Sequence, residues 1–97
     1  MANYILLLNW TEKGVSSAKE TVQRGEQVRQ MAQQMGCDLK TSYWTLGRYD
    51  SIALLEAPDD ETATAFALRA SAMGTVRTET LRAFTADEMS AILSRIG

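Results

Sequence analysis

The stretch that decides the fold is YILLLNW, residues 4–10, which is an unbroken apolar run rather than an alternation of apolar and polar residues. Runs of this kind are typical of β-strands that are buried on both faces. Thr11 can cap a helix after this strand, and apolar residues then recur at helical spacing until Gly36. We therefore predict a strand followed by one amphipathic helix over 11–35. Its predicted inward residues are Val15, Ala18, Val22, Val28, Ala32 and Met35, and Arg24 is among those predicted to face solvent.

The middle of the chain predicts a β-hairpin. Residues 37–46 are rich in Thr, Tyr and Trp and carry charges, which is typical of a more exposed strand. Residues 49–57 are again strongly apolar. Gly47 between them can adopt the positive φ of a tight turn, so the two strands are expected to be antiparallel neighbours.

The remaining sequence predicts a helix, a strand and a last helix. Asp59 can cap a helix that ends near Gly74, residues 76–84 form a polar strand, and 85–88 form a capping box before the last helix. The order β-α-β-β-α-β plus a terminal helix predicts an α+β fold, the ferredoxin-like arrangement of an antiparallel sheet with helices on one face.

Composition limits the classes of function. A chain of 97 residues with 45% hydrophobic content is expected to form one domain over 1–97. A net charge of −2 argues against nucleic acid as a partner. There is no histidine, and Cys37 is the only cysteine, so we expect no metal, no cofactor and no internal disulfide. No apolar run is long enough for a signal segment or a membrane span, which favours a cytoplasmic protein.

The central strand also predicts self-association. Helices in this topology cover one face of the sheet, whereas residues 4–10 are apolar on both faces. An uncovered apolar sheet face is unusual in a monomer. We therefore expect a homo-oligomer, a dimer or larger, in which a second copy covers that face.

Four blocks of sequence carry a family resemblance. They are LNWTE at 8–12, YWTLGRYD at 43–50, EAPDD at 56–60 and VRTETLRAF at 76–84. In this order they resemble the GYD domain family of small bacterial proteins, over nearly the whole chain. The resemblance implies a ferredoxin-like fold of the dimeric α/β-barrel type and no assigned reaction. Residues 47–80 are more distantly similar to the ligand-binding domains of leucine-responsive regulators, which bind amino acids at subunit contacts, although this chain has no helix-turn-helix.

Asp50 is the candidate for catalysis. It follows the predicted hairpin and shares a strand face with apolar residues, where a carboxyl group can have a raised pKa and act as a base. The alternative interpretation is that Asp50 is a structural acceptor for backbone N–H groups or the partner of an arginine, since short acceptors commonly stabilise turns. Tyr49 on the opposite face is a candidate ligand contact or a packed ring.

The remaining candidates are ligand-binding residues. Arg77 and Arg82 could hold a carboxylate, but their odd separation places them on opposite faces of one strand. Trp10 and Trp44, together with Tyr43, could form an aromatic wall or simply pack in the core.

Three functions fit these observations. The first is binding of a small organic acid or aromatic metabolite in a pocket between sheet faces. The second is a cofactor-independent isomerase, lyase or oxygenase, in which Asp50 is the base and an arginine stabilises the oxyanion. The third is a purely structural interaction subunit. The feature that separates these functions is whether Asp50 and an arginine converge on an enclosed cavity or face bulk water and each other.

Overall fold

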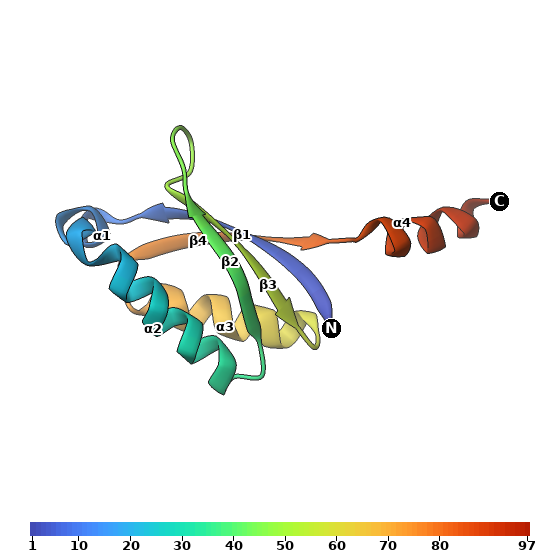
Figure 1. Cartoon of the computed structure of the whole chain (residues 1–97), viewed down its shortest axis with the longest axis horizontal. Coiled ribbons are helices and arrows are strands. Elements are labelled where there is room, and N and C mark those ends of the chain that lie inside the picture. The colour runs from blue at the N-terminus through green and yellow to red at the C-terminus, as the bar shows by residue number, and fades with distance from the viewer.

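Four antiparallel strands form one sheet in the order β2-β3-β1-β4, in a computed structural model that describes residues 1–97 (Figure 1). This order confirms the predicted ferredoxin-like α+β fold, with the two most apolar strands at the centre. The elements are β1 (Ala2–Trp10), α1 (Glu12–Ser16), η1 (Ala18–Glu20), α2 (Thr21–Gln34), β2 (Asp38–Trp44), β3 (Ser51–Ala57), α3 (Asp60–Ala72), β4 (Val76–Ala83), α4 (Ala86–Leu93) and η2 (Ser94–Ile96). None of the helices combines the length and the hydrophobicity needed to cross a bilayer.

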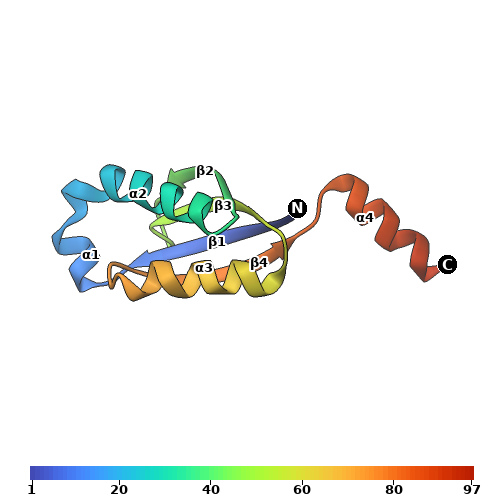
Figure 2. The same cartoon turned by 90° about the horizontal axis from the view of Figure 1, so that it is seen from below.

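The core lies between the sheet and the helices α2 and α3, which Figure 2 shows in front of the strands. Tyr4 and Leu6 of β1 and Leu55 of β3 point to this side and are buried. Phe66 of α3 packs among them with 1% of its surface exposed. Burial of these large side chains is the main source of stability for the sheet and α3.

The other face of the sheet has no helix over it. Its apolar side chains come from the three strands β1, β3 and β4, and cross-strand pairing places Leu54 and Leu81 on either side of Ile5. Leu54 and Leu81 are each 42% exposed. We call this surface the open face, and it consists of Ile5, Leu7, Ile52, Leu54 and Leu81.

The predicted single helix over 11–35 is wrong. The chain forms two α-helices, α1 and α2, joined through Ser17 and the short 3-10 turn η1. The cause is a close contact at the first of them, where a Cβ on Gly14 would lie 2.1 Å from the carbonyl oxygen of Thr75. Thr11 Oγ1 also donates to the Gly74 carbonyl at 2.6 Å. Because α1 is fixed against the start of β4, the chain must change direction before α2 can cross the sheet.

This break changes which residues face inward. Val15 and Val22 were expected in the core, but they are 57% and 68% exposed. Of the residues in α2, only Ala32 is fully buried. The helix is thus held mainly at its C-terminal end, where Ala32 joins the core cluster.

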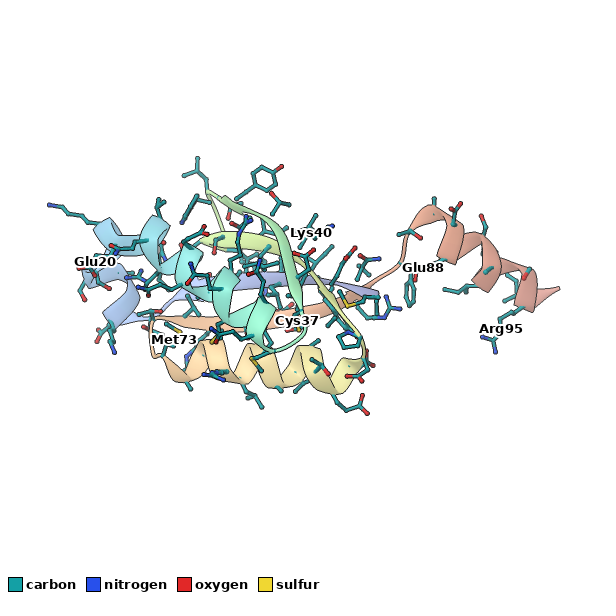
Figure 3. The ribbon with its side chains drawn as sticks, turned by 60° about the horizontal axis from the view of Figure 1, so that its bottom comes forward. Glu20, Cys37, Lys40, Met73, Glu88 and Arg95 are labelled. Carbon is teal, nitrogen blue, oxygen red and sulfur yellow. The ribbon has the colours of Figure 1, made fainter.

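The C-terminal helix α4 stands away from the rest of the molecule as an arm (Figures 1 and 2). The predicted capping box is present, with Thr85 Oγ1 accepting from the Glu88 N–H at 3.1 Å and the Glu88 carboxylate accepting from the Thr85 N–H at 2.8 Å. The second bond lowers the pKa of Glu88, because it stabilises the charged form. Figure 3 shows Glu88 and Arg95 on this arm, beyond the end of the sheet.

Candidate ligand-binding cavity

A cavity of about 100 Å³ lies on the helix side of the sheet, between the N-terminal half of α2 and α3. Its walls are mostly apolar. One of the lining residues is Met73 at the end of α3, which is labelled in Figure 3. The residues that line it are Leu6, Leu8, Trp10, Thr21, Arg24, Gly25, Val28, Leu39, Ser42, Tyr43, Trp44, Ser51, Ala53, Phe66, Ala67, Ala70, Met73, Thr75, Val76 and Thr78.

The floor of the cavity is a row of side chains that crosses all four strands. Trp44 of β2 pairs with Ser51 of β3, Ser51 with Leu8 of β1, and Leu8 with Thr78 of β4. Directly opposed residues share one face of a sheet, so these four side chains lie on the helix side together. The floor is therefore apolar at the centre and carries hydroxyl groups on both sides.

The cavity exists because α2 and α3 pack differently on the sheet. Along α3, the inward residues Ala63, Ala67 and Ala70 are small and buried. Along α2, Gly25 lines the cavity, and a Cβ on it would meet no atom within 4 Å. The first turns of α2 thus present Thr21, Arg24 and Gly25 to the cavity, and none of these is a large apolar side chain.

Arg24 of α2 is the one charged residue that lines the cavity. Its side chain is 15% exposed, contrary to the predicted solvent-facing position. Nη1 donates to the carbonyl oxygen and to the hydroxyl of Ser17, both at 2.9 Å. Nη2 is buried and has no hydrogen-bond partner. Unsatisfied buried polar atoms are rare in folded proteins, and an unpaired one on a charged group is costly.

One hydrogen bond ties the first turn of α2 to the sheet. Trp44 Nε1 donates to Thr21 Oγ1 at 3.1 Å, and both residues line the cavity. Trp44 remains 49% exposed. The indole thus forms part of the cavity rim between α2 and β2.

Comparison with known proteins agrees with this architecture. The sequence profile of the GYD domain matches residues 4–93. The chain belongs to the GYD domain family. No curated protein matches the sequence.

Two solved structures are similar to this GYD domain. The leucine response regulatory protein of Mycobacterium tuberculosis has a TM-score of 0.67 at 12% identity, with 88% of this chain and 51% of that chain covered. The GYD domain therefore spans about half the length of that regulator. The protein TTHA0845 of Thermus thermophilus has a TM-score of 0.58 at 23% identity, with 89% of this chain and 96% of that chain covered. At these identities the likeness establishes a shared fold.

The sequence GRYD at 47–50, part of the block at 43–50, forms a structural brace in this GYD domain. Gly47 has φ of 100°, the left-handed conformation expected for the turn. The turn is wider than predicted, because residues 45–50 form a loop and Asp50 precedes β3 instead of lying on it. The Asp50 carboxylate accepts a hydrogen bond from the Trp10 N–H at 2.8 Å, and the Asp50 N–H donates to the Leu8 carbonyl at 2.9 Å. Asp50 does not line the cavity. These bonds hold the end of β1 beside the hairpin and fix the backbone that carries Trp10.

Three predicted ligand contacts lie elsewhere. The Tyr49 hydroxyl donates to Glu79 Oε1 at 3.4 Å. Arg77 is exposed and pairs with Asn9 on the sheet face opposite the cavity. None of Tyr49, Arg77 and Arg82 lines the cavity, so the structure does not bring these residues together with Trp10 and Trp44.

Arg82 fixes the base of the C-terminal arm. Its guanidinium lies 5.5 Å from the ring centre of Tyr4 and 4.6 Å from that of Phe84. Nη1 donates to the Asn3 carbonyl at 3.2 Å, and Nη2 lies 3.8 Å from Glu88 Oε2. A structural role at the junction of β4 and α4 accounts for these contacts.

Sequence reasoning missed Arg24, although a signal was present. Arg24 precedes Val28 by four residues, and Val28 precedes Ala32 by four. Residues four apart share one face of a helix, so Arg24 continues the inward line of Val28 and Ala32 by one turn. The prediction that Arg24 faces solvent rested only on the charge of its side chain.

Cys37 remains a poor candidate for chemistry. The residue is 4% exposed, and burial raises the pKa of its thiol, with a further contribution from the negative charge of Asp59. A raised pKa keeps the thiol protonated and unreactive near neutral pH.

Proposed function

We propose that this GYD domain binds a small organic acid or aromatic molecule in the cavity between α2, α3 and the sheet. The observation that carries the proposal is an apolar space of about 100 Å³ with both tryptophans of the chain in its walls. Small-molecule sites are concave, mostly apolar and supplied with a few polar groups that orient the ligand. Leu8 and Ala53 supply the apolar surface here, and hydroxyl groups and Arg24 supply the polar groups.

This location differs from the pocket predicted between two sheet faces. The cavity lies within one chain and on the helix side of the sheet. A pocket between sheet faces needs a second chain, and it stays a prediction. The catalytic alternative is less well supported, because Asp50 is engaged by the Trp10 backbone and lies outside the cavity, as do Arg77 and Arg82.

The tryptophans provide the test. Because Trp10 and Trp44 both line the cavity, small aromatic and aliphatic acids that bind there should change the intrinsic fluorescence of the protein in a saturable way. Ala70→Leu places a longer side chain in the cavity wall and should abolish that response. Ala72→Leu is the matched control, since Ala72 is exposed on the same helix, and it should leave the response unchanged. Thermal melts of both variants verify the fold, and an unaltered response in a folded Ala70→Leu protein would contradict the proposal.

We also propose that two copies associate through the open face. Ile5 lies between Leu54 and Leu81 across three strands, and the two leucines are each 42% exposed. An apolar patch on a sheet that helices cover on one side only favours a second copy as its cover. The exposed residues Met89, Leu93 and Ile96 of the arm add apolar surface that could join the same contact.

Light scattering tests the association. The protein should have a mass of at least twice 10.7 kDa at micromolar concentration. Leu54→Glu should return it to one chain mass, because a charge on the open face cannot be buried without a partner. Leu68→Glu is the control, since Leu68 is 67% exposed on α3, away from the open face. A wild-type mass of one chain would contradict the proposal.

A further inference from the structure

We propose that the ligand of the cavity is a short monocarboxylate, held by the guanidinium group of Arg24, and that amino acids are excluded. This inference deepens the proposed function and rests on it. In this proposal Arg24 binds the anionic group, and the wall formed by α3 limits the length of the ligand's apolar tail.

The state of the guanidinium calls for an anion. An arginine side chain keeps its charge in proteins, and Nη2 carries two N–H donors. No atom of the chain accepts from Nη2, although it is buried. The nearest acid is Glu20, whose Oε2 lies 3.9 Å from Nη1 and whose side chain is 68% exposed. An ion pair this long and this exposed compensates little of the buried charge. Because Arg24 lines the cavity, a carboxylate bound there would supply the missing negative charge beside the guanidinium group.

The rest of the lining decides against an amino acid. Arg24 is the single charged residue in the wall, and neither Asp nor Glu lines the cavity. The ammonium group of a zwitterion would therefore lose its water without gaining an anionic partner. Burying such a charge unpaired is much more costly than burying a methylene group. A second carboxylate on the ligand would likewise have no cation to meet.

The size of the cavity limits the tail. An engineered apolar cavity of about 150 Å³ holds one benzene molecule. A space of about 100 Å³ accordingly accepts an apolar tail of about four carbons. The small side chains of Ala67 and Ala70 on α3, with Phe66 beside them, form the wall that such a tail would reach.

Three probes of equal length separate the possibilities. Pentanoate carries the charge and the tail, pentanamide carries the same tail without the charge, and 2-aminopentanoate adds the ammonium group. Titration at neutral pH, followed by tryptophan fluorescence and by calorimetry, should show pentanoate binding about ten- to a hundredfold tighter than pentanamide, since hydrogen bonds to charged groups are the stronger class. Binding of 2-aminopentanoate should be weaker than that of pentanoate by at least a similar factor.

Two variants assign the effect to Arg24. Arg24→Met keeps the apolar stem, and it should reduce pentanoate binding to the level of pentanamide or below, because the carboxylate loses its cation, while pentanamide binding changes little. Arg29→Met is the matched control, because Arg29 lies on the same helix with 47% of its side chain exposed. It should leave the affinities for all three probes as in the wild type.

The outcomes separate this inference from the proposed function. Equal binding of pentanoate and pentanamide would overturn the role of Arg24 and leave a neutral binding cavity. Tight binding of 2-aminopentanoate would overturn the exclusion of amino acids. If Arg24→Met unfolds, the comparison of the three probes on the wild-type chain still decides the matter. The absence of any response to these probes and to aromatic acids would overturn both proposals.

Discussion

The two helices that cover the sheet, α2 and α3, differ in how closely they fit it. Helix α3 buries four residues, the three small ones Ala63, Ala67 and Ala70 and the large Phe66. Helix α2 is longer, yet it buries Ala32 alone. Helix α3 presents short side chains to the strands, whereas the first turns of α2 present Arg24, Gly25 and Val28 to the cavity. The cavity is the consequence of this difference.

The difference separates the part of the chain that stabilises the fold from the part that is available for binding. Stability is concentrated where large apolar area is buried, which is along α3 and the two central strands. Ligand sites need space and unsatisfied polar groups, and these are found under the first half of α2. Four sets of substitutions test this division, in order of decreasing expected effect.

The largest effect is expected at Phe66. Phe66→Ala should lower the free energy of unfolding by about 3–5 kcal/mol, because it removes a fully buried ring and leaves a void. Val22→Ala on α2 should change it by less than about 0.5 kcal/mol, since Val22 is 68% exposed. Urea denaturation of the two variants measures both values. Similar losses for the two would show that α2 contributes as much as α3.

Substitutions of two glycines compare α1, which packs closely on Thr75 through Gly14, with the first turns of α2, where Gly25 lies beside open space. Gly14→Ala should cost about 1–3 kcal/mol, because the new Cβ would lie 2.1 Å from a backbone oxygen that cannot move aside freely. Gly25→Ala should instead stabilise the protein by about 0.5–1 kcal/mol, because the Cβ meets nothing and alanine favours the helix. Thermal unfolding would show shifts of opposite sign. Shifts of the same sign would mean that the space beside Gly25 is not open.

Most of the fold could be predicted from local patterns, and the site could not. The apolar run at 4–10, the hairpin at Gly47 and the capping box at Thr85 are determined by neighbouring residues, and the structure confirms each. The break after α1 depends on Thr75, which lies 61 residues from Gly14 in the sequence, so no local signal predicts it.

The cavity was missed for a related reason. Trp10 and Trp44 were predicted to form an aromatic wall, and both line the cavity. Arg24 was excluded because charged side chains usually face solvent, and its burial follows from the geometry of α2 after the break. A cavity forms where the side chains of packed elements leave space between them. The spacing of residues in the sequence does not predict where this happens.

Asp50 tests whether the brace at the end of β1 serves the cavity. Asp50→Ala should lower stability by about 1–2 kcal/mol, because it leaves the Trp10 N–H without its acceptor. Asp50→Asn should cost less, since an amide oxygen can still accept the same bond. Ligand binding should weaken in proportion to the loss of the folded state and no further. If Asp50→Asn folds but no longer binds ligand, Asp50 takes part in ligand binding and is more than a structural brace.

The smallest expected effect concerns how each helix is fastened at its first turn. Tyr4 Oη donates to Asp60 Oδ1 at 2.5 Å at the start of α3, whereas α2 has the longer bond from Trp44 to Thr21. This hydrogen bond to Asp60, with burial and the charge of Asp60 adding to it, raises the pKa of Tyr4 to about 12. The ordinary value for a tyrosine is about 10. The folded state therefore holds the proton more tightly, and the stabilising contribution is complete below about pH 10 and is lost as the pH rises toward 12.

Absorbance titration of the phenols measures this effect. Tyr4 should titrate near 12, and Tyr4→Phe should remove that step from the titration curve. Asp60→Asn should move the pKa of Tyr4 back toward about 10, because the amide carries no charge and accepts a weaker hydrogen bond. Glu61→Gln is the control, since Glu61 is an exposed carboxylate on the same turn, and it should leave the pKa of Tyr4 unchanged. An unaltered Tyr4 titration in Asp60→Asn would mean that burial alone sets the pKa and that the start of α3 is fastened no more firmly than the start of α2.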